Sequence, residues 1–201
     1  MKGTSTMASI SNDLTGKTIA ILVADGFEEI EMTSPRAALE AAGATTKIVS
    51  LAHGHVEGWN HFDKGAKFKV DQVVSAASAD DFDGLLLPGG VANPDQLRVN
   101  PDALAFVRAF FIQHKPVAAI CHAPWTLIDA QCVSGRRMTS YPSIKHDLIN
   151  AGAHWTDEDV VVDQGLVTSR SPKDLPAFNA KLVEEVAEGL HAGQSASPAA
   201  R

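Results

Sequence analysis

Cys121 is the residue whose type and setting point most directly to chemistry. It follows the apolar run 117–120 and precedes His122, Ala123 and a proline. A thiol on a sharp turn between a strand and a helix is displayed to solvent, and small neighbours suit such a tight elbow. The positive end of the following helix should favour the thiolate and lower the thiol pKa. We therefore predict a nucleophile, with a buried structural cysteine as the alternative.

Two further loops carry groups that could assist a thiol. Glu28 and Glu29 follow an apolar strand and precede a helix. They are either favourable charges at a helix N-terminus or the source of a carboxyl that hydrogen-bonds the thiol. Residues 88–90 read Pro-Gly-Gly, which forms a bare turn or presents backbone N–H groups to a developing oxyanion. Consecutive side chains usually diverge, so adjacency alone does not pair His122 with the cysteine.

Other reactive residue types are expected to be structural. Cys132 ends a helical stretch away from any strand end and is interpreted as core filling. His53, His55 and His61 have no carboxylate or cysteine at ligand spacing, so we predict no metal site. Trp125 follows the elbow and could wall a pocket, although tryptophans more often serve packing.

The loops that carry these residues must be positioned by buried strands. Four apolar or β-branched runs are typical of such strands: residues 18–24, 45–51, 84–90 and 117–120. The expected helices are one up to 42 with a kink or restart at Pro35, a short one before Asp83, one from Pro101, and others over 123–130, 144–151 and 174–189. The remaining expected strands are a hairpin near 67–70, a strand over 138–141 and a hairpin over 160–169. Strands that alternate with helices predict an α/β fold with a mostly parallel sheet covered on both faces. The carboxyl ends of its strands would bring the three loops together.

Composition bounds the class of protein. The chain has 201 residues, 45% of them hydrophobic and 20% charged, which suits one ordinary domain. We predict this domain over residues 17–190, between disordered segments 1–16 and 191–201. The formal net charge of -7 and the absence of a dense basic stretch argue against nucleic acid as the main partner.

Cellular context is predicted from the cysteines and the hydropathy pattern. Two cysteines are too few for a disulfide framework and suit a reducing compartment. No run is long and apolar enough to span a membrane, and Met1 to Lys17 lacks the apolar core of a secretory signal. We therefore expect a cytoplasmic protein without a membrane partner.

Five motifs together resemble the PfpI family, the intracellular protease and general stress protein branch of the superfamily that includes the parkinsonism-associated DJ protein. They read "ADGFEEIE", "LLLPGG", "AICHAPW", "MTSYPSIKHDLINAGAHW" and "VVVDQGLVTSRSPKDLPAFN". The resemblance covers about residues 17–190 and keeps the order and spacing of the motifs. It implies a flavodoxin-like three-layer α/β sandwich, which agrees with the pattern of strands and helices.

The resemblance also implies roles for individual residues. Cys121 would be the nucleophile, and His122 would be the histidine of the Cys-His-acid triad. Glu28 would be a protonated carboxyl that hydrogen-bonds the Cys121 thiol. Asp95, in the context Pro-Asp-Gln-Leu-Arg, would complete a triad from a neighbouring subunit, which requires at least a dimer. Gly90 and the His122 amide would serve an oxyanion. Gly89, Ala123, Trp125 and Tyr141 are further candidates for the oxyanion or substrate site.

Two positions depart from the family pattern. Ala123 stands where the family usually has glycine, and one methyl group there could narrow the pocket or shift the elbow. Asp95 is one methylene shorter than the usual glutamate, so a triad across an interface would be looser or bridged by water. Neither change removes the nucleophile.

The resemblance implies a cofactor-free cysteine enzyme whose substrate is a small carbonyl compound or a peptide. The activities to be weighed are peptidase, glyoxalase, and deglycase on glycated amines or thiols. All of them can begin with attack of the Cys121 thiolate on a carbonyl. Our working hypothesis is carbonyl detoxification or deglycation in a stress response. The alternatives are a redox sensor or chaperone that uses oxidation of Cys121, and a glutamine amidotransferase-like amidase.

Overall fold

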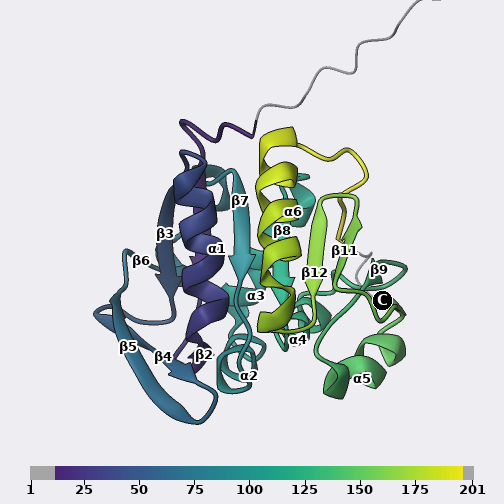
Figure 1. Ribbon diagram of the computed structural model, residues 1–201, viewed down its shortest axis with the longest axis horizontal. Helices are drawn as coiled ribbons and strands as arrows, with labels where there is room; N and C mark the ends of the chain where they lie inside the picture. The colour runs from purple at the N-terminus through teal and green to yellow at the C-terminus, as the bar shows by residue number, and fades with distance from the viewer. Residues whose placement is uncertain (1–11, 197–201) are drawn as a thin grey trace, which may run out of the picture.

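A seven-stranded sheet forms the centre of the computed structural model, which describes residues 12–196 (Figure 1). The strand order is β11-β12-β8-β7-β1-β3-β6, and every pairing is parallel except that of β11 with β12. The strands are β1 Thr18–Leu22, β3 Thr45–Ser50, β6 Gln72–Val73, β7 Gly84–Leu87, β8 Val117–Ile120, β11 Val160–Asp163 and β12 Leu166–Ser169. Strands β7 and β8 are buried along their whole length, as their unbroken apolar sequences predict.

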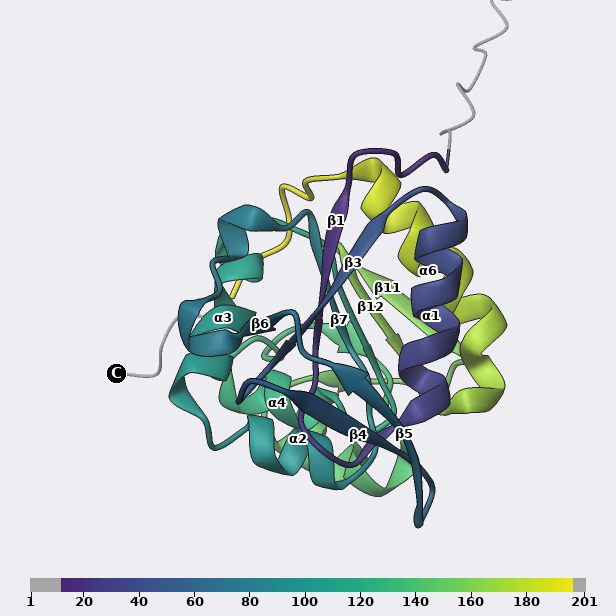
Figure 2. The ribbon, with the colours of Figure 1, turned by 90° about the vertical axis from the view of Figure 1, so that its left-hand side faces the viewer.

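Helices cover both faces of this sheet (Figure 2). One face carries α1 Glu29–Ala41 and α6 Leu175–Glu188, which pack side by side. The other carries α3 Pro101–Ile112 and α4 Pro124–Asp129. The remaining helices are α2 Ala92–Leu97, α5 Lys145–Asn150 and the 3-10 turns η1 Val74–Ala76, η2 Ala79–Asp81, η3 Pro142–Ile144 and η4 Pro172–Asp174. The predicted three-layer α/β sandwich with a mostly parallel sheet is confirmed.

Each face of the sheet has its own apolar core. On the α3 face, Phe106 meets Phe110 edge to face with ring centroids 5.2 Å apart. On the α1 and α6 face, Met32 and Phe178 are fully buried. Helix α3 begins as its sequence predicts, because the side chain of Asn100 accepts a hydrogen bond from the amide of residue 103 at 3.0 Å.

A smaller sheet lies beside the main one and ends in a two-residue turn. It contains β2 Phe27–Glu28, β4 His55–Asn60 and β5 Asp63–Lys69, in the order β2-β4-β5. The antiparallel β4–β5 hairpin extends away from the body of the molecule (Figures 1 and 2). The sequence predicts a hairpin only near residues 67–70, and the structure shows a longer one. The last small sheet pairs β9 Arg137–Met138 with β10 His154–Trp155.

Two local expectations differ from the structure. Helix α1 passes through Pro35 as one helix, where a kink or restart was expected. Helix α2 is not among the expected elements, and it forms with Pro94 inside it. None of the helices within residues 12–196 has the length and apolar character needed to cross a membrane.

The chain ends are ordered further than the sequence predicts. Leu14, in the segment expected to be disordered, is fully buried, and its amide donates to the carbonyl of Ala42 at 2.7 Å. Residues 191–196 fold back as a strap. Within it, the Gln194 side chain is fully buried and accepts from Arg136 at 2.7 Å. The disorder predicted for residues 12–16 and 191–196 is therefore wrong, because specific polar partners hold these short segments. The rest of those predictions concerns residues 1–11 and 197–201, which lie outside the described part.

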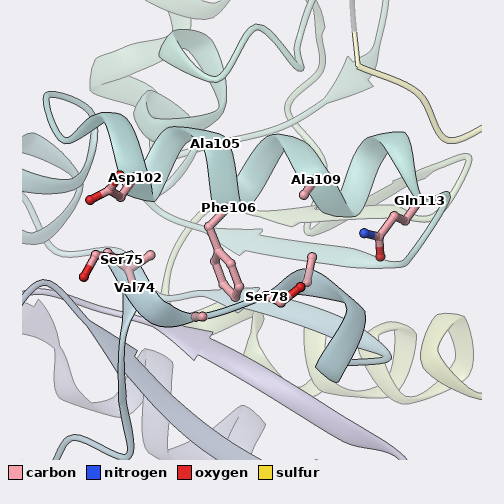
Figure 3. A pocket seen from close by; sticks show the side chains of 10 residues that line it. Val74, Ser75, Ser78, Asp102, Ala105, Phe106, Ala109 and Gln113 are labelled. Carbon is pink, nitrogen blue, oxygen red and sulfur yellow. The ribbon is translucent and has the colours of Figure 1, made fainter.

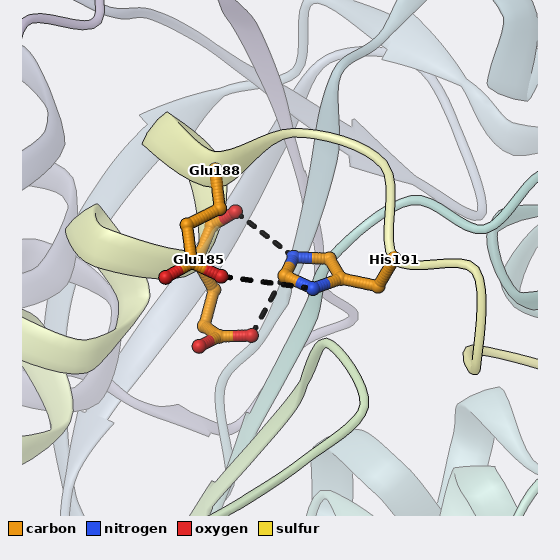
Figure 4. A group of neighbouring side chains, drawn as sticks. All are labelled: Glu185, Glu188 and His191. Carbon is orange, nitrogen blue, oxygen red and sulfur yellow. Dashed lines mark hydrogen bonds and ion pairs between the residues drawn. The ribbon is translucent and has the colours of Figure 1, made fainter. Parts of the chain in front are cut away.

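A histidine holds the start of this strap against the last helix (Figure 4). The His191 ring lies between the carboxylates of Glu185 and Glu188, at 3.5 and 3.9 Å. These three side chains are close enough to hold a metal ion. Each ring nitrogen faces a different carboxylate, and Nε2 also lies 3.1 Å from the backbone carbonyl of Glu185, so the cluster joins the strap to α6.

Candidate active site

Cys121 lies on a strained elbow between β8 and α4. Its φ of 63° is in the left-handed region that residues other than glycine rarely adopt. The surrounding backbone holds this conformation, because the Cys121 amide donates to Ser169 at 3.0 Å and its carbonyl accepts from Tyr141 at 2.9 Å. The next residue but one, Ala123, is buried within the turn. The sharp strand-to-helix elbow expected from the sequence is thus present, but the thiol on it is buried rather than displayed.

The predicted meeting of the three loops is also present. Strands β1, β7 and β8 are neighbours, and their carboxyl ends lead to residues 25–31, 88–90 and 121–122. Gly89 lies between two of these loops. A Cβ atom on it would come within 2.5 Å of the Glu31 carboxylate and 2.6 Å of the Cys121 Cβ. Glycine is needed there because no side chain fits between the carboxyl and the thiol.

The carboxyl beside the thiol is Glu31, and the assignment of that role to Glu28 is wrong. Glu31 is fully buried in the first turn of α1 and interacts with Cys121. Glu28 ends β2, and its Oε2 accepts from the backbone amide of His61 at 3.1 Å. The three-residue difference arises because α1 starts at Glu29, which turns residue 31 inward and leaves residue 28 facing the β4–β5 turn.

Glu31 holds its proton at neutral pH. Burial raises the pKa of its carboxyl to about 8, although the Gly89 amide donates to Oε2 at 2.9 Å and acts in the opposite direction. The other oxygen, Oε1, is buried and has no further hydrogen-bond partner among the described residues. Oε1 is therefore the oxygen that can carry the proton, since Oε2 already accepts from Gly89.

The thiol pKa is shifted in the direction opposite to the expectation. Burial raises the pKa of Cys121, and the negative charge of an ionised Glu31 raises it further. The backbone amides of Gly90 and His122 donate toward the sulfur and favour the thiolate. The helix-end effect is therefore outweighed by burial, since the cysteine is only 7% exposed.

His122 pairs with the cysteine despite being its neighbour in sequence. Its Nδ1 lies 3.2 Å from the Cys121 sulfur, and its Nε2 lies 3.0 Å from the Ser143 hydroxyl. Burial lowers the pKa of the imidazole and keeps it neutral at pH 7. A neutral ring that accepts the thiol proton at Nδ1 carries its own proton at Nε2, toward Ser143. No motif or spacing marked Ser143 as a site residue.

Aromatic rings fix the imidazole on two sides. Tyr141 stacks on it with centroids 4.7 Å apart, and Trp125 meets its edge at 5.4 Å. Tyr141 lines the cavity in front of the thiol. Trp125 lies behind His122 and donates to Asp147 at 2.7 Å, so it is not among the residues that wall the cavity.

A cavity of about 470 Å³ opens in front of the thiol. This volume is within the range of small-molecule sites. The residues that line it are Glu28, Glu31, His61, Phe62, Gly90, Val91, Cys121, His122, Tyr141 and Pro172.

Asp95, Cys132 and a further hollow all lie outside this cavity. Asp95 is exposed on α2 and lines an adjoining cavity, and within the described chain Nε2 of His122 contacts Ser143 instead. Cys132 is fully buried, in keeping with core filling. A third hollow, of about 270 Å³ between α3 and η1, has no cysteine or histidine in its lining (Figure 3).

Comparisons with known proteins match most of the chain. A model described as the DJ-1/PfpI family matches residues 17–185. The chain is 48% identical over 163 residues to "Putative cysteine protease YraA" of Bacillus subtilis, covering 81% of this chain and 94% of that protein. It is 41% identical over 166 residues to "Deglycase PH1704" of Pyrococcus horikoshii, covering 83% and 97%.

Solved structures show the same fold. The chain superimposes on Drosophila melanogaster DJ-1beta with a TM-score of 0.78 and 29% identity, covering 85% of this chain and 90% of that one. A two-domain protein from Anabaena variabilis with a DJ-1/ThiJ/PfpI-like domain gives a TM-score of 0.80 and 33% identity, covering 85% of this chain and 48% of that one.

Proposed function

Because the chain belongs to the DJ-1/PfpI family, we propose that it is a cofactor-free cysteine enzyme that acts on small reactive carbonyl compounds, with Cys121 as nucleophile. The observation that carries this proposal is the strained Cys121 elbow, which faces a cavity of about 470 Å³ between a protonated carboxyl and a neutral imidazole. The names of two relatives, a cysteine protease and a deglycase, support the same class of chemistry.

The first step follows from the contacts of the thiol. Cys121 passes its proton to Nδ1 of His122, and the sulfur attacks the carbonyl carbon. A C–S bond forms while the carbonyl π bond becomes an alkoxide. The amides of Gly90 and His122 lie where they can donate to developing negative charge. Protonation of the oxygen by the imidazolium gives a hemithioacetal and returns His122 to its neutral form.

A 2-oxoaldehyde such as methylglyoxal then needs two internal proton transfers. The hydrogen on the hemithioacetal carbon leaves as a proton and is returned to the neighbouring carbonyl carbon, and the hemithioacetal hydroxyl loses its proton while the neighbouring carbonyl oxygen gains one. The first carbon is thereby oxidised to a thioester and the second is reduced to an alcohol. His122 and Glu31 are the groups beside the sulfur that can move these protons. Water then cleaves the thioester, which gives lactate and restores the thiol.

A peptide substrate is the second candidate, favoured by the name of the Bacillus subtilis relative. The same nucleophile would attack a peptide carbonyl and release an amine. The cavity volume suits a short peptide or a small molecule better than a folded protein.

The proposal is tested by turnover in matched cysteine variants. Wild type, Cys121→Ser and Cys132→Ser would be assayed with methylglyoxal, with glycated amines and with short peptides. We expect Cys121→Ser to lose about 10³-fold or more of the activity, and Cys132→Ser to keep it, since Cys132 lies in the core. A wild-type protein without turnover on any of these, whose Cys121 is oxidised to a stable sulfinic acid, would overturn the enzyme in favour of a redox sensor.

A further inference from the structure

A fully buried asparagine joins two of the three loops that meet at the thiol. Asn93 lies in α2, and its exposed fraction is 0%. Its Oδ1 accepts a hydrogen bond from the amide of Ala24 at 2.7 Å, just after β1. Its Nδ2 donates to the carbonyls of Pro88 at 2.8 Å and Gly89 at 3.1 Å. Burial of an amide side chain is costly unless it is hydrogen-bonded, and these three bonds offset that cost.

The Pro88 carbonyl belongs to a peptide unit that also serves the buried carboxyl. A trans peptide unit is planar, and its C=O and N–H point in opposite directions. The unit with the Pro88 carbonyl carries the Gly89 N–H, which donates to Oε2 of Glu31 at 2.9 Å. The bond from Asn93 to this carbonyl therefore fixes the direction of the N–H that holds the Glu31 carboxyl.

The next peptide unit repeats this relationship at the thiol. It carries the Gly89 carbonyl at one end, and at the other the Gly90 N–H, which donates toward the Cys121 sulfur. The carbonyl also accepts from the amide of Glu28, at the longer distance of 3.4 Å. Without the Asn93 donor, this longer bond alone would hold the carbonyl, and the Gly90 N–H could turn away from the sulfur.

The choice of partners argues for a role beyond the anchoring of α2. Both Nδ2 bonds go to consecutive carbonyls whose peptide N–H groups contact the reacting groups. We propose that Asn93 is a positioning residue that orients the two glycine amides of the 88–90 loop toward the Glu31 carboxyl and the Cys121 sulfur, and thereby sets the reactivity of the thiol. This inference rests on the proposed function, since it assigns these amides to a sulfur that acts as nucleophile.

Alkylation of Cys121 tests the orientation of the Gly90 amide without any turnover. Iodoacetamide is neutral and reacts with the thiolate, so its rate at a given pH reports how strongly the site stabilises that anion. Asn93→Leu has a similar size, no charge and no donor. We expect its alkylation rate to be about tenfold lower than that of wild type at every pH measured, because a hydrogen bond to a charged group is lost. Mass spectrometry separates the Cys121 peptide from that of Cys132.

Amide hydrogen exchange distinguishes positioning from a general loss of stability. In Asn93→Leu, the Gly89 and Gly90 amides should exchange about tenfold faster, measured against the amides of β7, which pairs with β1 and β8. Leu97→Ala is the matched control, because Leu97 is a buried apolar residue of the same helix. It should destabilise the protein and leave both the relative exchange of the glycine amides and the alkylation rate within about twofold of wild type.

Two further measurements apply if the leucine variant does not fold. Asn93→Asp keeps the shape and the acceptor for Ala24 but loses at least one N–H donor. Its negative charge slows alkylation by itself, so the faster exchange of the glycine amides is the deciding result for this variant. In wild type, both Nδ2 protons of Asn93 should exchange at least about tenfold more slowly than those of the exposed Gln113 amide. Equal exchange rates would show that the bonds to the 88–90 loop are absent.

The outcomes separate this inference from the proposed function. A wild-type alkylation rate, or wild-type exchange of the glycine amides, in folded Asn93→Leu would overturn the positioning role. The same changes in Leu97→Ala would assign the effect to the packing of α2 and also overturn it. Slower alkylation with faster local exchange, in a protein that turns over no carbonyl compound, would keep the positioning role and reject the enzyme. Turnover without these effects would do the reverse.

Discussion

Glu31 and Cys121 form a buried carboxyl–thiol pair, and Gly89 lies so close to both that any side chain at this position would collide with them. The protonation state of the Glu31 carboxyl decides whether it stabilises or destabilises a thiolate at Cys121. A protonated Glu31 offers a hydrogen-bond donor to a developing thiolate, whereas an ionised one repels it. Since burial raises the Glu31 pKa to about 8, the neutral form prevails at physiological pH.

The first prediction concerns stability against pH in Glu31→Gln. The folded-state pKa of Glu31 is raised above its usual value of 4.5, so the folded protein binds the proton more tightly than the unfolded chain does. The stability that this proton contributes is present below about pH 4.5 and is lost as the pH rises toward about 8. Glutamine cannot ionise, so the stability of the variant should not show this decrease with rising pH.

Urea unfolding measures the difference. Between about pH 5 and about pH 8, the free energy of unfolding of wild type should fall by roughly 2–4 kcal/mol relative to Glu31→Gln. Glu184→Gln, a half-buried carboxylate on α6 that pairs with Lys181, serves as the control and should follow wild type. Parallel curves for wild type and Glu31→Gln would show that Glu31 is ionised in the folded protein across this range.

The second prediction treats Ser143 as a positioning residue for His122. Ser143→Ala removes the hydroxyl 3.0 Å from Nε2, which leaves the imidazole free to change its tautomer. We expect kcat/KM to fall about 3- to 10-fold, with a changed pH profile of kcat. Ser143→Thr restores a hydroxyl and should recover most of the activity. Equal losses in the alanine and threonine variants would point to a steric effect instead.

The third prediction measures the strain at the elbow. At a φ of 63°, glycine avoids the steric cost that a Cβ atom incurs, so Cys121→Gly should be more stable than Cys121→Ala by about 1 kcal/mol. The same two substitutions at Cys132 are the control. Cys132 does not have a positive φ, so alanine should be the more stable residue there. Thermal or urea unfolding of the four variants measures the stability difference between glycine and alanine at each site. If alanine were the more stable residue at both sites, the result would argue against strain at Cys121.

The fourth prediction concerns the C-terminal strap. Gln194→Ala removes the acceptor of Arg136 and the donor to the Lys115 carbonyl at 3.2 Å, and leaves both groups buried. The expected loss of stability is about 1–3 kcal/mol, with activity per folded molecule unchanged. Gln113→Ala, which removes a hydrogen bond to the surface residue Asp80, should cost about 0.5 kcal/mol or less. A Gln194→Ala protein as stable as wild type would show that the strap contributes little.

The sequence predicts the sheet and the cysteine elbow because both depend on local patterns. An unbroken apolar run such as 117–120 is compatible with a strand covered on both faces, and a thiol at its end has few structural uses. The convergence of three loops follows from the rule that the carboxyl ends of parallel strands lie on one edge. These inferences need no knowledge of side-chain directions.

Prediction from the sequence fails where the role of a residue depends on the direction of its side chain. Glu28 and Glu31 differ by less than one helical turn, and only the start of α1 determines which one faces the thiol. A signal was available, since Glu31 shares a helical stripe with the buried residues Met32, Pro35 and Leu39. The thiol pKa was misjudged for a related reason, because burial is a property of the whole fold and outweighs the nearby helix end. Ser143 approaches His122 only through tertiary packing.

The β4–β5 hairpin lines the entrance of the site but is not part of the sheet that carries Cys121. The turn residues His61 and Phe62 line both cavities, yet the hairpin contributes no strand to the seven-stranded sheet that holds Cys121. Its sequence can therefore diverge between relatives without disturbing the Cys121 elbow. For protein engineering, this makes the hairpin a natural segment to exchange, because a transplanted turn would alter which molecules enter while the reacting groups stay in place.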